Sequence, residues 1–73
     1  MKFEKTCKCN IECRRPNEGV NNNECVFLKG HEYQVDEYVY LDRSHYKVYP
    51  NGGWNDFVFF EENDFREFFE LIK

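Results

Sequence analysis

The sequence predicts an α+β fold: a small, curled antiparallel sheet of four to five strands, closed on one side by one C-terminal amphipathic helix. Three observations support this class. Apolar and polar residues alternate near the N-terminus, a tyrosine-rich segment in the middle has the pattern of a hairpin, and phenylalanines near the C-terminus recur at helical spacing. With 73 residues, the chain is predicted to form a single domain over 1–73.

Residues 1–13 are predicted to form an N-terminal strand. Its odd positions carry the apolar residues Phe3, Cys7, Cys9, Ile11 and Cys13. Alternate side chains of a strand point to opposite faces, so these residues are expected to face the core. The next segment, 14–24, contains a proline, a glycine and three consecutive asparagines, and it is predicted to be an exposed loop. Loops of this length often carry recognition residues.

Residues 25–60 are predicted to form a β-meander. Gly30 permits a turn between an apolar run and the next strand. In EYVYLDRSHYKVYP, tyrosines alternate with aliphatic residues on both sides of DRS, which is the pattern of a hairpin with a turn at 42–44. The PNGGW segment that follows is a second strong turn signal, and DFVFF is a further short strand.

Residues 62–72 are predicted to form the helix. Phe65, Phe68, Phe69 and Ile72 stand at i, i+3, i+4 and i+7, which places them on one face of a helix that can dock on a sheet. The whole arrangement predicts the outline of a small SH3-like barrel.

The net charge of −4 argues against some functions. An acidic chain without a lysine or arginine stripe is not expected to bind nucleic acid through phosphates. No apolar run approaches the roughly 18 residues of a membrane span, and none has the length of a signal peptide. We therefore expect a cytoplasmic protein, with no membrane partner and with reduced thiols.

The cysteines Cys7, Cys9, Cys13 and Cys25 leave three interpretations open. A zinc site usually uses two C-x₂₋₄-C pairs, whereas the spacing here is C-x-C-x₃-C-x₁₁-C, with His31 and His45 as substitute ligands. A disulfide or redox pair is the second interpretation, and buried thiols are the third. The alternation of the N-terminal strand favours buried thiols, so no cofactor is expected, with zinc as the alternative.

Exposed aromatic residues on a sheet often form contact surfaces for proteins or stack on bases, although they also form small secondary cores. The candidate partner-binding residues are Arg14, Arg15, Tyr38, Tyr40, Tyr49 and Trp54. No catalytic residue is predicted, because Ser44 and His45 are strand neighbours that face opposite ways and no acid is placed to orient the histidine.

The segments FLKGHEYQV and YVYLDRSHYKVYPNGGWNDFVFFEENDFREFF resemble a pattern in small phage and prophage proteins. That pattern is F-x-K-G-x-x-Y, a tyrosine-rich hairpin, a glycine-containing turn, an F-x-F strand and a helix with F-x-x-F/Y-F. The resemblance covers residues 25–72. It implies an SH3-like outline and a non-enzymatic accessory protein that binds and modulates or inhibits a host protein, such as a defence nuclease in the manner of anti-CRISPR proteins.

Two alternative functions stay open. One is a small zinc- or nucleic-acid-binding module that uses Lys8, Arg14 and Arg15 beside the cysteines. The other is an acidic nucleic-acid mimic, in which carboxylates of the C-terminal helix imitate a row of phosphates. The carboxylates of that row are Glu61, Glu62, Asp64, Glu67 and Glu70.

Overall fold

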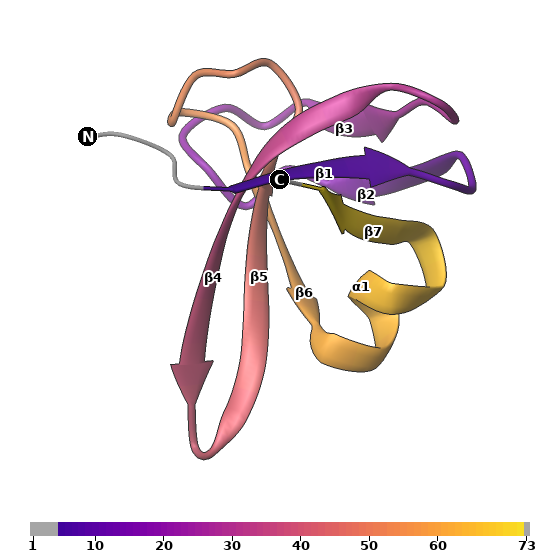
Figure 1. Cartoon of the computed structure of the whole chain (residues 1–73). Helices are drawn as coiled ribbons and strands as arrows, with labels where there is room; N and C mark the ends of the chain where they lie inside the picture. Colours follow the sequence, from indigo (N-terminus) through magenta and orange to yellow (C-terminus); the bar gives the residue numbers. More distant parts are fainter. Residues whose placement is uncertain (1–4, 73) are drawn as a thin grey trace.

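The computed structural model describes residues 5–72, which form seven strands and one short helix (Figure 1). In chain order the elements are β1 (Lys5–Cys9), β2 (Cys13–Pro16), β3 (Glu24–Phe27), β4 (Glu32–Tyr40), β5 (Arg43–Tyr49), β6 (Val58–Glu61), α1 (Glu62–Phe68) and β7 (Phe69–Ile72). The strand pairings among residues 5–72 are antiparallel. The predicted α+β class is therefore confirmed.

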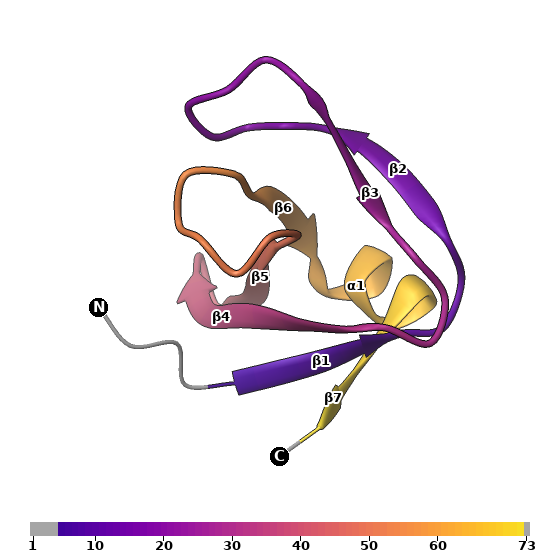
Figure 2. The same cartoon turned by 90° about the horizontal axis from the view of Figure 1, so that it is seen from above.

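Two sheets surround the core. Five strands form the larger sheet in the order β6-β5-β4-β1-β7, and β2 pairs with β3 in a separate two-stranded sheet. Figure 2 shows β2 and β3 arching around the interior that β1 and β4 border, with α1 lying inside this curve. The larger sheet is strongly curled but is not closed.

The core consists largely of aromatic rings. Phe69 meets Phe27 and Phe60 edge to face, with ring centroids 5.4 and 5.2 Å apart. Phe65 stacks on Tyr46 with centroids 3.9 Å apart. Such ring pairs stabilise a fold by roughly 0.5–1.5 kcal/mol each beyond the area that they bury. These contacts join both sheets and α1 in one core, which suits a chain with little room for a larger one.

The N-terminal strand is shorter than predicted. Residues 1–4, including Phe3, lie outside the described residues; β1 ends at Cys9, and a new strand, β2, begins at Cys13. Between them the chain turns, and the N–H groups of Asn10 and Ile11 donate to the carbonyl oxygen of Phe68 at 2.7 and 3.4 Å. Ile11 lies in this turn and is 50% exposed, so its predicted place in the core is wrong.

The predicted loop 14–24 is also shorter, because residues 14–16 belong to β2. Arg15 is the register partner of Cys25 in β3, so the loop that remains spans residues 17–23. The predicted meander 25–60 holds for β4, β5 and β6, which pair in sequence order, whereas β3 pairs with β2 in the other sheet. A turn does occur at Gly30, whose φ of 86° lies in the left-handed region that favours glycine.

The predicted helix 62–72 is wrong in its second half. α1 ends at Phe68, and the chain continues as β7, which pairs with β1 from Cys9↔Phe69 to Thr6↔Ile72. A seven-residue helix has little stability of its own. Pairing with β1 gives residues 69–72 a full ladder of hydrogen bonds, and it still buries Phe65 and Phe69 in the core.

Candidate protein-binding surface

The far end of the β4–β5 hairpin exposes four consecutive large apolar residues. Tyr38, Val39, Tyr40 and Leu41 are 39%, 72%, 60% and 77% exposed. Among the described residues, β1 pairs with β4 only from Glu32 to Val35, and β6 pairs with β5 only from His45 to Val48, so residues 39–44 extend beyond the sheet's other strands (Figure 1). Because successive side chains of a strand point to opposite faces, Tyr38 and Tyr40 lie on one side of the hairpin and Val39 on the other, so its end exposes apolar side chains on both faces. Isolated exposed apolar residues are common, whereas a group of them is typical of an interaction site.

The turn of this hairpin is strained. Leu41 and Asp42 form a two-residue turn with φ values of 53° and 63°, between the register partners Tyr40 and Arg43. Hairpin turns with positive φ at both residues favour Asn-Gly, because other L-residues lose roughly 1–2 kcal/mol per residue in this conformation. Leucine is therefore a poor choice for the stability of the turn. Backbone strain of this kind is concentrated at functional sites.

Aromatic rings extend from the hairpin across the outer face of the sheet. Tyr38 stacks on His45 with centroids 5.5 Å apart, and Tyr40 meets the same imidazole edge-on at 5.8 Å. Phe59 of β6 packs against Tyr38 at 6.5 Å and is 45% exposed. We define the hairpin surface as the residues Tyr38, Val39, Tyr40, Leu41, His45 and Phe59.

An open depression of about 700 Å³ lies beside the hairpin surface, between the hairpin and the junction of β6 with α1. Its lining residues are Tyr40, Leu41, Arg43, Ser44, His45, Glu61, Glu62 and Asn63. Glu61 is the register partner of His45, so strand pairing brings the carboxylates of the junction to the aromatic end of the hairpin. Glu62 forms an ion pair with Arg66 at 2.8 Å.

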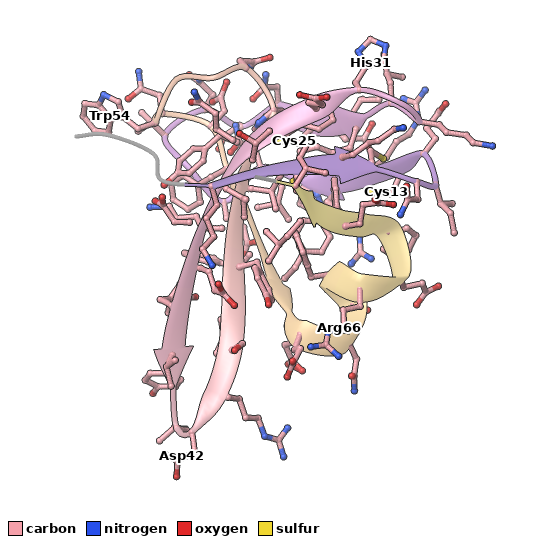
Figure 3. All side chains as sticks on the ribbon, in the orientation of Figure 1. Cys13, Cys25, His31, Asp42, Trp54 and Arg66 are labelled. Carbon is pink, nitrogen blue, oxygen red and sulfur yellow. The ribbon has the colours of Figure 1, made fainter. Side chains whose placement is uncertain are left out.

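Two of the predicted aromatic contact residues lie elsewhere. Tyr49 is only 2% exposed, and its hydroxyl donates to Asp36 Oδ2 at 2.6 Å. The pKa of Tyr49 is raised above its usual value, mainly because its hydroxyl is buried. Trp54 is 70% exposed, but Figure 3 shows it at the opposite end of the molecule from Asp42 in the hairpin turn. Tyr38 and Tyr40 thus share a surface with each other but not with these two residues.

The two predicted arginines have different environments. Arg14 is exposed and lies 3.5 Å from Glu24. The guanidinium carbon of Arg15 lies 5.2 Å from the ring centroids of both Phe60 and Phe68, and its Nη1 is 3.7 Å from Asp64 Oδ2. Arg15 therefore joins β2 to β6 and α1, and replacing it would test the fold as well as any binding role.

The acidic row that was proposed as a phosphate mimic is not one helix face. Glu62 and Asp64 are paired with Arg66 and Arg15, and Glu70 lies on β7 instead of the helix. Two of the five carboxylates are therefore engaged within the fold, and two others, Glu61 at the end of β6 and Glu70 on β7, lie outside the helix.

The loop 17–23 is held against the loop that follows β5. Asp56 accepts hydrogen bonds from the side-chain amides of Asn17, Asn21 and Asn51 at 2.8, 2.7 and 3.0 Å. These bonds lower the pKa of Asp56, with the Asn17 bond as the largest cause. Asn17 and Asn21, which belong to the loop predicted to be a recognition loop, therefore stabilise the contact between the two loops.

All four cysteines belong to the hydrophobic core as free thiols. Cys9 Sγ donates to the carbonyl oxygens of Ile11 and Phe27 at 3.1 and 3.6 Å. Burial, with a smaller contribution from nearby Cys9, raises the pKa of Cys7 to about 12 and that of Cys13 to about 11. Between residues 5 and 72, no three His, Cys, Asp or Glu side chains are grouped so that they could hold a metal ion. This geometry favours buried thiols over the zinc and disulfide interpretations.

We expect all four thiols to resist iodoacetamide at pH 8 while the protein is folded. Thiolate is the reactive species. All four thiols are buried, and burial raises the pKa of each above its usual value, so little thiolate forms at pH 8. Mass spectrometry should count no adducts before denaturation and four after it. Rapid labelling of Cys7 in the folded protein would show that β1 opens, and a bound metal in a native spectrum would support the zinc alternative.

Comparison with protein-family models, curated proteins and solved structures finds no match to this chain. Within the described part of the chain, no helix is both long and apolar enough to cross a membrane.

Proposed function

We propose that this chain is a non-enzymatic binding protein that contacts a partner protein through the hairpin surface. One observation carries the proposal: four consecutive exposed apolar side chains, residues 38–41, lie at the end of a projecting hairpin. Tyrosines are enriched at the energetic centres of protein interfaces, because they bury a large area with few rotatable bonds.

Local charge favours a protein over a nucleic acid as the partner. Aromatic rings on a sheet also stack on single-stranded bases, but such sites combine the rings with a groove of positive charge. The turn and the depression carry Arg43 beside Asp42, Glu61 and Glu62. This balance would repel a phosphate backbone.

We further propose that the partner is a host protein, which the chain modulates or inhibits. The resemblance of residues 25–72 to small phage accessory proteins supports this narrower function and the SH3-like outline. The arrangement of β4, β5, β6 and a short helix before the last strand is compatible with that outline.

The variant Leu41→Asn is expected to separate binding from stability. Asparagine tolerates positive φ, so the free energy of unfolding should rise by about 0.5–1 kcal/mol. Loss of an exposed leucine from an interface should weaken partner binding at least about tenfold. Urea denaturation measures the first effect. Titration of a recombinant partner, first identified by affinity capture, measures the second.

Two further variants control this experiment. Val20→Asn removes an equally exposed apolar side chain from the 17–23 loop and should change neither quantity. Trp54→Ala removes the exposed aromatic residue at the other end of the molecule. If Trp54→Ala abolishes binding while Leu41→Asn leaves it intact, the hairpin surface is not the contact surface.

A further inference from the structure

The depression beside the hairpin has two walls of different chemistry. Tyr40 and Leu41 form an apolar wall, and both side chains are more than half exposed, at 60% and 77%. Glu61, at the end of β6, and Glu62, at the start of α1, supply carboxylates to the lining. A space with an apolar wall and a carboxylate wall suits a side chain with an apolar stem and a positive end.

Charge at the depression is negative. Its lining residues include two glutamates, Glu61 and Glu62, and one arginine, Arg43, a balance of −1. Glu62 is neutralised by Arg66. The Glu61 carboxylate takes part in none of the side-chain ion pairs or hydrogen bonds found among residues 5–72. Arg43 also lines the depression, so the lining carries one arginine and two glutamates, of which Glu62 is paired with Arg66.

The fold already uses the same chemistry elsewhere. Arg15 lies against the rings of Phe60 and Phe68 while its guanidinium approaches Asp64. Lys47 Nζ lies 4.0 Å from the ring centroid of Phe57. A cation held by an aromatic ring, with or without a carboxylate, is thus a stable arrangement on this sheet. Such contacts stabilise by roughly 0.5–2 kcal/mol, more when the cation is desolvated.

We infer that the depression receives a lysine or arginine side chain of the partner protein, beside an apolar side chain that covers Leu41. The stem of the cationic residue lies along Tyr40, and its charged end meets the Glu61 carboxylate. This inference rests on the proposed function, because it names the chemistry of the segment that the hairpin surface binds. Charge complementarity selects this partner over a second copy of the chain, whose net charge is also −4.

A displayed library of random peptides tests this without a known partner. Peptides selected on the wild-type protein should be enriched in lysine or arginine next to a large apolar residue. One synthetic peptide from the selection, and its Lys→Met or Arg→Met form, then serve as probes in titrations. We expect Glu61→Gln to weaken the first peptide about five- to tenfold and to have no effect on the second.

Glu67→Gln is the matched control, because it removes the same charge from an exposed position of α1 that does not line the depression. It should leave the affinity unchanged. Glu61→Lys should reverse the preference, so that selection yields acidic peptides. Amide chemical shifts of residues outside the depression report whether each variant keeps the fold.

The outcomes separate this inference from the proposed function. The inference would be wrong if the selected peptides bind through Leu41 but lack a basic residue, or if Glu61→Gln leaves their affinity unchanged. The proposed function would still stand in both cases. If acidic peptides are selected and their binding depends on Arg43, the partner side chain in the depression is negative and the inference is wrong. If no peptide depends on the hairpin surface, or if sedimentation shows self-association that Leu41→Asn abolishes, both the inference and the proposed function fail.

Discussion

Replacing Phe69 with alanine is expected to lower the free energy of unfolding by about 3–5 kcal/mol, the range for a buried phenylalanine. Phe69 is 2% exposed and is the first residue of β7. Its ring meets Phe27 and Phe60 edge to face and stacks on Phe65 at 5.3 Å. Alanine would leave a cavity where β3, β6 and α1 converge.

The free energy of unfolding of native proteins is roughly 0.05–0.15 kcal/mol per residue, so this loss is large for so small a domain. Urea denaturation followed by circular dichroism measures it. Phe59→Ala makes the same chemical change on the outer face, where the ring is 45% exposed, and it should cost less than about 1.5 kcal/mol. Equal losses of stability in the two variants would contradict the conclusion that the stabilising core lies on the face opposite Phe59.

Local patterns predicted which residues are buried better than they predicted the elements. Alternation placed Cys7, Cys9 and Cys13 in the core, and helical spacing did the same for Phe65 and Phe69; all five are buried. Burial depends on which residues are apolar, and several backbone conformations can satisfy one apolar pattern. The hairpin was predicted because its strands are adjacent in sequence, but its turn is formed by Leu41 and Asp42 and not by residues 42–44.

The elements that were missed depend on contacts between distant parts of the chain. β7 forms because residues 69–72 pair with β1, which lies 60 to 66 positions earlier in the sequence. The β1–β2 turn likewise depends on the carbonyl of Phe68. Helical spacing in FREFFELI gave no sign of a strand, because tertiary pairing overrides local propensity in so short a segment.

The candidate site was predicted in part. Tyr38 and Tyr40 were selected as exposed aromatics, but nothing local showed that Tyr49 is buried or that Trp54 lies at the far end of the molecule. Leu41 was missed as a site residue. A signal for it was present, since YVYL is a run of four apolar residues directly before a turn, and such a run on a surface is unfavourable unless it has a function.

Gly19→Ala is expected to destabilise the fold by about 1–3 kcal/mol, the usual effect of an added methyl group with no space to occupy. A Cβ at this position would lie 2.0 Å from the backbone oxygen of Asn55. The neighbouring N–H groups of Glu18 and Val20 donate to the carbonyls of Phe57 and Asn55 at 2.9 and 2.8 Å. Both loops are therefore fixed by backbone contacts on either side of the glycine, and neither can move away without losing hydrogen bonds.

Gly53→Ala is the matched control, because no atom lies within 4 Å of its added Cβ and its φ is not in the left-handed region. Urea denaturation should show no loss of stability for this variant. In the Gly19→Ala protein, the amide signal of Phe59 should also shift, since that N–H donates to Glu18 Oε1 at 2.8 Å. If both alanine variants are equally stable, the two loops can move apart to admit the methyl group at little cost in free energy. The edge of β6 that carries Phe59 would then be held by β5 alone, and the loop 17–23 would again be available for recognition.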